Sequence, residues 1–443
     1  MTDVDVAVVG AGLAGLSTAR RLVRAGHRVE VFESEGTVGG RMRSTRIHGY
    51  TIDRGAETLA SRGYPTTWRL IRELGLDKAG DLHRIRHPVA LWRDGRAHPW
   101  LGHPLSAVTG AGLPIGRRVV LGRIALSALR HGMALGDDPT DNPYGTRTLA
   151  DLGAEHGQEI VRDLFGPISA SAFGWLPERS AAAPLLATVV QTRGVVGWQT
   201  YRDGQDTLVR ALATGLPVHL ATPVAAVKRD GAGARVELAD GTSRTARAVV
   251  LTVPAPQVAA LYPDVPAEEA AFLRASTFSS VMRVAVLLDR PLEPRRRRFA
   301  PKLYAALLST GENPLLVGCT VEHNKCPARA PSGRGLVSLL ISPRRVPELF
   351  DEPDDVVVGE VLREGAKIID GLPEAVVGAE VVRWRHALPE VRPEALRRWS
   401  AFVRRDPGPI EYAGDWLLLM PSSEAAAASA DYVVGRVESL LGR

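Results

Sequence analysis

The N-terminal stretch Val4–Gly15, which reads VDVAVVGAGLAG, decides the fold class of this chain. An apolar strand runs directly into Gly10, Gly12 and Gly15, which have the GxGxxG spacing, and a helix is expected from Ala14. The first glycine of this pattern permits a tight turn, the second lets backbone N–H groups approach a pyrophosphate, and the third lets helix and strand pack closely. The stretch therefore predicts an α/β protein with a Rossmann-like dinucleotide-binding domain.

A second strand is expected at Arg28–Phe32, and Glu33 follows it directly. In dinucleotide-binding folds an acid at about this place binds a ribose hydroxyl. The helix N-terminus at Leu13 and Ala14 offers N–H groups and the positive end of the helix dipole to the pyrophosphate. A plain strand-to-helix turn is the alternative, and the position of Glu33 argues against it.

A second glycine pair, Gly39-Gly40, is followed by an arginine. The glycines allow another close backbone approach, and Arg41 can offer a planar fork of donors to phosphate oxygens. The run from Glu33 resembles the Glu-x-x-x-x-x-Gly-Gly-Arg segment of the large FAD family that contains amine oxidases, protoporphyrinogen oxidases and carotenoid desaturases. A glycine-rich surface loop is the alternative. The cofactor-binding residues expected from this run are Glu33, Ser34, Gly39, Gly40, Arg41 and Met42.

Two further segments resemble the same family. Gly49–Glu57 is similar to its hydrophobic-Asp-x-Gly-Ala segment, which implies that the backbone at Gly55 and Ala56 runs beside the flavin. Near the far end of the chain, Gly414-Asp415 resembles the Gly-Asp element of the family, in which the aspartate reaches a ribityl hydroxyl. The resemblance therefore places both ends of the chain at one ligand, FAD.

The last helix is expected to begin at Ser422, and it resembles the Glu-Gly-Ala-x-x-Ser-Gly helix of the family. The resemblance implies that its N-terminus, at Ser423, Glu424 and Ala425, points at the flavin, where negative charge develops on reduction. Two glycines of the family pattern are alanines in this chain, Ala425 and Ala430. This departure is the only support for a catalytically inactive FAD-binding scaffold.

The resemblance implies three interleaved parts. The expected parts are a discontinuous FAD-binding domain at 1–90, 200–258 and 395–443, a substrate-binding domain with a mixed sheet at 91–100 and 259–394, and a helical lobe at 101–199. Within them we expect one strand at His219–Val227, with backbone groups near Val224 holding the adenine, and strands at Val281–Leu288 and Gly335–Ser342 in the substrate domain.

Apolar residues recur at helical spacing between Val119 and Met133 in the expected lobe, with arginines between them. Such a basic amphipathic helix could contact a membrane surface, as the lobe of the protoporphyrinogen-oxidase and desaturase branches does. The alternative is a helix packed on the protein's own core with its arginines in water.

Composition narrows the setting further. A chain of 443 residues is longer than a single hydrophobic core usually supports, so more than one domain is expected. Its net charge of +6 comes mostly from arginines, and the sequence contains no nucleic-acid-binding motif. Cys319 and Cys326 form no metal motif, and no cysteine lies near Gly414 or Ser422, so we expect free thiols and non-covalent FAD. With no signal peptide and no apolar stretch of about 20 residues, we expect a cytoplasmic monomer or homodimer without a metal.

Glu57 and Arg283 are the candidate catalytic residues. Glu57 could act as an acid or base if burial raises its pKa. Arg283 resembles in position a lysine of amine oxidases, but an arginine keeps its proton, so it could orient an acidic or carbonyl-bearing substrate. Ordinary ion-pair roles are the alternatives for both.

The stretch Val382–Glu390 resembles the Arg-Trp-x-x-Ala-x-Pro segment of protoporphyrinogen oxidases, which implies that Trp384 packs near the flavin. A tryptophan of the core is the alternative. His323 and His386 are the histidines expected to face the substrate, although a lone histidine is more often structural. Ser422 stands where amine oxidases carry one aromatic wall of a cage, so selection of an amine by cation–π contact loses support.

The sequence thus predicts an FAD-dependent oxidoreductase that removes hydride from a C–H bond of a fairly large apolar small molecule to flavin N5. Oxygen is the expected electron acceptor, and the pattern is nearest to the protoporphyrinogen-oxidase branch. Two alternatives stay open: an amine or amide oxidase that forms an imine and releases peroxide, and the inactive scaffold.

Overall fold

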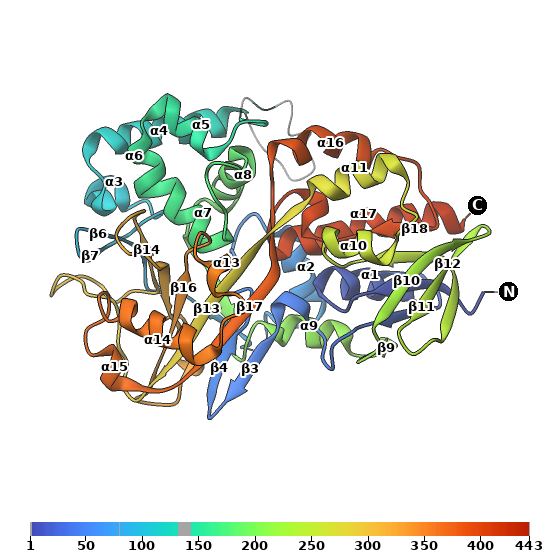
Figure 1. The fold of residues 1–443 in the computed structure, drawn as a ribbon, viewed down its shortest axis with the longest axis horizontal. Coiled ribbons are helices and arrows are strands. Elements are labelled where there is room, and N and C mark those ends of the chain that lie inside the picture. The colour runs from blue at the N-terminus through green and yellow to red at the C-terminus, as the bar shows by residue number, and fades with distance from the viewer. Residues whose placement is uncertain (1, 79, 132–141, 143, 443) are drawn as a thin grey trace.

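The computed structural model describes residues 2–78, 80–131, 142 and 144–442, and two large sheets organise them (Figure 1). The first sheet has seven strands, in the order β10 (Val224–Asp230), β11 (Gly233–Leu238), β12 (Ser243–Leu251), β1 (Val4–Val9), β2 (Val29–Phe32) and β9 (Val218–His219), with β18 (Ile410–Tyr412) beside β12. Strands β9, β2, β1, β12 and β18 run parallel, and β10 and β11 are antiparallel to their neighbours. The apolar sequence of β1 suits a strand that is covered on both faces.

Segments from three distant parts of the chain build this sheet, and both chain termini lie at its side of the molecule (Figure 1). The expectation of one strand at His219–Val227 is wrong. The chain forms two strands there, β9 and β10, which pair with different neighbours. The break between them contains Ala221, at φ 50°, and Pro223, which has no N–H to donate to a ladder.

The second sheet is mostly antiparallel. Its seven strands follow the order β17 (Val376–Glu390), β13 (Thr277–Leu288), β16 (Gly335–Ile341), β15 (Leu316–Val321), β14 (Ala305–Leu308), β6 (Val89–Arg93) and β7 (Arg96–Pro99). Only β14 and β6 pair in parallel among these strands. Two small antiparallel pairs complete the described strands: β3 (Ser44–Ile47) with β4 (Tyr50–Asp53), and β5 (Leu82–Arg84) with β8 (Gln199–Tyr201).

Helices cover both sheets (Figure 1). Around the first sheet lie α1 (Leu13–Arg24), α2 (Pro65–Glu73), α9 (Asp206–Ala213), α10 (Ala255–Leu261), α11 (Ala267–Ala275), α16 (Pro393–Val403) and α17 (Ser423–Leu441), and beside the second lie α12 (Glu322–Lys325), α13 (Val346–Leu349), α14 (Asp354–Gly365) and α15 (Leu372–Ala375). The first and last helices of the chain, α1 and α17, pack against each other. This contact brings the N-terminal glycine turn and the C-terminal segment to one place.

A helical lobe lies on one side of the second sheet (Figure 1). It contains α3 (Ser106–Thr109), α4 (Ile115–His131), α5 (Leu149–His156), α6 (Gln158–Ile160), α7 (Gly166–Phe173) and α8 (Ala182–Thr192). In α4, Ile124 is buried, whereas Val119 and Leu129 are exposed, so part of the predicted apolar pattern faces the core and part faces outward. Met133 lies outside the described residues. Among those that are described, no helix is long and apolar enough to cross a membrane.

Candidate active site

A cavity of about 1190 Å³ runs through the middle of the molecule. One end is lined by the turn after β1 and by the segment at Gly39–Met42. The other end is lined by the lobe helices α4, α7 and α8. Strands β13 and β17 also line the cavity. Most of the residues that the sequence predicts for cofactor and catalysis lie on this one surface.

The three glycines of the first turn have separate roles. Gly10 has a φ of 104°, a left-handed conformation that favours glycine. A Cβ atom on Gly15 would lie 2.0 Å from the carbonyl oxygen of Gly10, so Gly15 permits close packing of α1, and it does not line the cavity. A Cβ on Gly12 would meet no atom within 4 Å, and Gly12 does line the cavity. Gly12 therefore leaves room in the cavity for a ligand to approach the backbone.

Glu33 is buried at the cavity wall, directly after β2. Its Oε2 accepts a hydrogen bond of 2.7 Å from the backbone N–H of Ala11, and its Oε1 accepts one of 3.0 Å from Glu35. Gly39 donates its N–H to the carbonyl of Ala11 at 2.8 Å. These bonds tie the carboxylate and the second glycine pair to the first glycine turn.

Arg41 and Asp415 meet at the cavity although 374 positions separate them in the sequence. The guanidinium donates two parallel hydrogen bonds to the carboxylate, of 2.7 and 2.8 Å, and a third of 2.9 Å to the carbonyl of Ala387. Such a fork gives strong and directional pairing. Two residues that the sequence predicts separately for FAD are thus one structural unit.

The Gly55-Ala56 segment lies directly against Arg41. Ala56 donates its N–H to the carbonyl of Arg41 at 2.9 Å, and a Cβ on Gly55 would lie 2.0 Å from that oxygen. Trp384 donates its indole N–H to the carbonyl of Arg54 at 2.7 Å and also faces the cavity. Other expected cofactor residues on the cavity wall are Leu13, Ala14, Ser34, Met42, Val224, Gly414 and Ser423.

Two residues expected at the cofactor lie away from the cavity, at the start of α17. The Glu424 carboxylate accepts the backbone N–H groups of Thr66 and Thr67, at 2.9 and 2.8 Å, and so caps α2. Ala425 is fully buried in the core, as is Ala430. Ser422 accepts the N–H of Ala425 and lines the cavity in their place.

The two expected substrate histidines are separated by the fold. His386 lines the cavity, with its ring edge-on to Phe278. His323 lies outside the cavity, and its Nδ1 is 3.0 Å from the carbonyl and 3.1 Å from the N–H of Leu336. We therefore leave His323 out of the substrate site.

Glu57 and Arg283 form an ion pair on the cavity wall. Nη1 of Arg283 donates to Oε1 of Glu57, and the hydroxyl of Tyr304 donates to Oε2 at 3.3 Å. Arg283 is only 5% exposed, and its Nη2 has no hydrogen-bond partner. A buried charged donor without a partner is costly.

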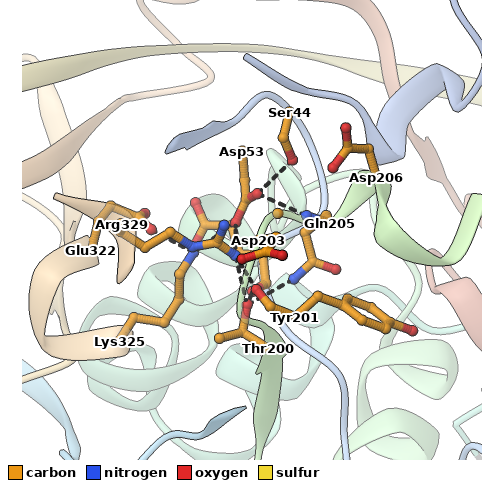
Figure 2. A network of polar contacts seen from close by, with 12 residues as sticks. Ser44, Asp53, Thr200, Tyr201, Asp203, Gln205, Asp206, Glu322, Lys325 and Arg329 are labelled. Atoms are coloured by element: carbon orange, nitrogen blue, oxygen red, sulfur yellow. Dashed lines mark hydrogen bonds and ion pairs between the residues drawn. The ribbon is translucent and has the colours of Figure 1, made fainter. Parts of the chain in front are cut away.

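A buried ionic cluster lies behind this pair and was not predicted from the sequence (Figure 2). Oδ2 of Asp53 is 3.1 Å from Nζ of Lys325 and 2.9 Å from Nη2 of Arg329. Lys325 also lies 2.5 Å from Glu322. Ser44 and the backbone N–H of Gln205 donate to the other oxygen of Asp53, at 2.7 and 3.0 Å.

The cluster sets the protonation of its members. Burial alone would raise the pKa of Asp53, but Lys325 and Arg329 outweigh burial and hold the pKa below its ordinary value. For Glu57 the balance is reversed: burial first, and then the Glu322 carboxylate, raise its pKa above the ordinary value against Arg283 and Lys325. Glu57 is therefore the carboxylate of this group that most readily holds a proton.

The sheet order and the glycine turn after β1 described above define a Rossmann-like α/β fold. The family model described as flavin containing amine oxidoreductase matches residues 13–416, and the chain belongs to this family. AofH of Mycobacterium tuberculosis, provisionally named as a flavin-containing monoamine oxidase, is 30% identical over 287 residues, which cover 60% of each chain and thus less than two thirds of that relative.

Two longer matches span nearly the whole chain. Coproporphyrinogen III oxidase of Bacillus subtilis is 22% identical over 425 residues, covering 87% of each protein. The solved structure of wild-type putrescine oxidase bound to putrescine superposes with a TM-score of 0.78 at 19% identity, covering 99% of both chains. This structural match confirms the predicted α/β fold class. The domain boundaries expected from the sequence stay a prediction.

Proposed function

We propose that this chain binds FAD non-covalently and removes hydride from a C–H bond of a fairly large apolar small molecule, with oxygen as the electron acceptor. The observation that carries the proposal is the single cavity that joins a glycine-lined end to an apolar end. Its volume of about 1190 Å³ exceeds the roughly 300–1,000 Å³ of ordinary ligand pockets. A dinucleotide and a substrate can therefore share it.

The residues of the glycine-lined end fit FAD. Gly12 leaves space in the cavity for a ligand to approach the backbone, and the side chains of Glu33, Arg41 and Asp415 are held in place by hydrogen bonds. When bound, FAD would supply the hydride acceptor, and the chain would orient the reactants and exclude water. Burial raises the pKa of the Cys319 thiol, the cysteine that lines the cavity, to about 12. A thiol in that state is a poor nucleophile, which supports non-covalent attachment.

The opposite end favours an apolar substrate. Leu113, Leu121, Ile124, Phe165 and Leu185 line the cavity there. Burial of such surface stabilises apolar ligands by about 25 cal/mol per Å². Exposed apolar residues on α3 and α4 support a second part of the proposal, peripheral membrane contact through the lobe.

Two measurements on the purified protein test this proposal. Its visible spectrum and the supernatant after denaturation should show about one free FAD per chain. Incubation with a porphyrinogen, a carotenoid precursor and other apolar molecules should give a product two hydrogens lighter, with peroxide and without ammonia. A protein that carries and binds no flavin would refute the proposal.

Oxidation of an amine or amide to an imine is the second candidate. The observation in its favour is that Glu57, a possible proton acceptor, lines the cavity together with Arg283. Peroxide together with ammonia from primary amines would support this candidate. The inactive scaffold loses its basis, because Ala425 and Ala430 lie in the core and do not narrow the cavity.

A further inference from the structure

A surface pocket of about 440 Å³ lies beside the cavity. It is formed by the loop before α2, by α2 itself and by the first residue of β8. Among the residues that the structure describes, Tyr64 is the one that lines both the surface pocket and the cavity. Its side chain therefore belongs to the wall between the two spaces.

The rest of this wall is thin. Ala60 lines the cavity, and the next residue, Ser61, lines the surface pocket. On the paired segment Trp198 lines the cavity and Gln199 lines the surface pocket. Leu59 and Gln199 join these two segments by backbone hydrogen bonds of 2.7 and 2.8 Å. A single thickness of chain thus separates the surface pocket from the cavity at this place.

The backbone of the wall is held in place. The indole N–H of Trp68 donates to the carbonyl of Ala60 at 2.9 Å. Gly63, at φ 76°, packs so closely on α8 that a Cβ would lie 2.9 Å from the backbone of Gln191. Since a shift of the backbone would break these contacts, the Tyr64 side chain is the part of the wall that can turn.

One hydrogen bond holds the Tyr64 ring in the wall. Its hydroxyl bonds the side chain of Ser422, which lines the cavity directly before α17. Burial, and after it the Glu424 carboxylate, raises the pKa of Tyr64 to about 12, so the ring stays a neutral phenol. Breaking a hydrogen bond between neutral groups costs little. The surface pocket offers the ring space into which it can turn.

The position of Tyr64 in the cavity is defined by α17. Ser422 and Ser423 line the cavity where this helix begins. The helix packs against the 3-10 helix Asp415–Leu418, whose first residue pairs with Arg41. An opening at Tyr64 therefore reaches the cavity beside the residues proposed to hold FAD.

We propose that the Tyr64 side chain is a gate between the surface pocket and the cavity, and that oxygen reaches the cofactor through this gate. The inference rests on the proposed function in one respect: it takes FAD to lie beside Ser422. Oxygen takes up the two electrons and two protons that leave the substrate, and it departs as hydrogen peroxide. Because both molecules are small and uncharged, one turned side chain opens enough room for them but not for a large substrate.

The rates at which small reagents react with the bound flavin test the gate, followed by flavin absorbance in a stopped-flow instrument. The purified flavin-containing protein is mixed first with dithionite, a small anionic reductant, and the reduced protein is then mixed with oxygenated buffer. Tyr64→Ala should speed both reactions at least about threefold, and Tyr64→Trp should slow both. Arg62 and Arg72 are exposed and line the surface pocket. Their joint replacement by glutamine should slow the dithionite reaction about twofold and leave the oxygen reaction unchanged, because only dithionite is charged.

Two further variants separate the gate from a general disturbance. Tyr432→Ala is the matched control, since Tyr432 is a partly buried tyrosine of α17 that bonds the carbonyl of Val403 at 2.6 Å and lines neither space. Both of its rates should equal those of the parent protein. Tyr64→Phe keeps the ring without the hydroxyl, so its rates should lie between those of the parent and Tyr64→Ala. Thermal unfolding checks each fold, and Tyr64→Phe carries the test if the alanine variant does not fold.

Parent-like rates in both Tyr64→Ala and Tyr64→Trp would overturn the inference. Slower reactions in Leu121→Trp, which narrows the apolar end, together with unchanged rates in the Tyr64 variants, would also overturn it, because oxygen would then enter by the route of the substrate. The flavin content of each sample is measured first. A protein that binds no FAD contradicts the proposed function, whereas a flavin-containing protein with unchanged rates contradicts the gate alone.

Discussion

Two regions at the cavity arise from the sequence in different ways: its glycine-lined end, and the charged group formed by the Glu57–Arg283 pair and the cluster that contains Asp53 and Lys325. At the glycine-lined end, Gly10, Gly12 and Gly15 stand within six residues of one another. In the charged group, the side chains come from β4, α12 and β13 and from the loops beside them, which are far apart in the chain. The first kind of site is defined by local spacing, and the second exists only after the chain has folded.

The largest effect is expected at Gly15. Gly15→Ala would place a methyl group 2.0 Å from the Gly10 carbonyl oxygen and 2.7 Å from the Thr252 hydroxyl. Because backbone must move, we expect a loss of more than about 3 kcal/mol in the free energy of unfolding. Chemical denaturation measures it. Gly435→Ala in α17 is the control, since its Cβ would meet no atom within 4 Å; equal stability of the two variants would contradict close packing at the turn.

A substitution of Lys325 tests the buried charged cluster. Lys325→Met leaves Asp53 and Glu322 without their shared, fully buried cation. Removal of one partner from a buried ion pair costs about 3–5 kcal/mol. Lys228→Met, which removes an exposed pair with Glu237 at 2.8 Å, should cost less than about 1 kcal/mol. If denaturation midpoints of the two variants agree, the cluster does not stabilise this region.

Acid should lower the free energy of unfolding through Asp53 of the charged cluster, by a smaller amount than the two substitutions above. The pKa of Asp53 is lowered from 3.8 in the folded chain, so its contribution to stability is present above about pH 3.8 and is lost as the pH falls through the lower, folded-state pKa. Urea denaturation over this range should therefore show a shallower pH dependence in Asp53→Asn than in the parent protein. Asp370→Asn, at an exposed position, should keep the parent slope.

The smallest expected effect is on FAD affinity, after substitution of Arg41 at the glycine-lined end of the cavity. Arg41→Lys replaces the fork to Asp415 by a single ammonium. We expect FAD to bind about tenfold more weakly, which is about 1.4 kcal/mol. Arg46→Lys removes a similar fork, to Asp206 at 3.0 Å, outside the cavity. FAD titration of the two apoproteins should separate them, and an equal loss in both would argue against a role for Arg41 at the cofactor.

The residues of the glycine-lined end could be selected from the sequence because their signals are local. The spacing of the glycines, Gly39-Gly40-Arg41 and Gly414-Asp415 follow from what a backbone needs at a dinucleotide. The same reasoning fails at Glu424, because a carboxylate at a helix start can cap a neighbouring helix instead.

The charged cluster could not be predicted in the same way. Glu322 and Lys325 stand one helical turn apart, an arrangement that is common on exposed helices. Only the packing of the short 3-10 helix Pro327–Arg329 against both α12 and β4 brings Lys325 and Arg329 to Asp53 in the interior. Likewise, nothing local indicates that His386 faces the cavity and His323 does not.

The flavin content of three purified proteins, compared side by side, tests the central claim most directly: that one cavity holds FAD at its glycine-lined end and carries out chemistry at the other. The parent protein should carry about one releasable FAD per chain. Gly12→Ala should keep its thermal stability but retain less than about a tenth of the FAD, because its methyl group takes cavity space. Arg283→Gln should retain all of it. Full FAD in Gly12→Ala, or loss of FAD in Arg283→Gln, would contradict the account.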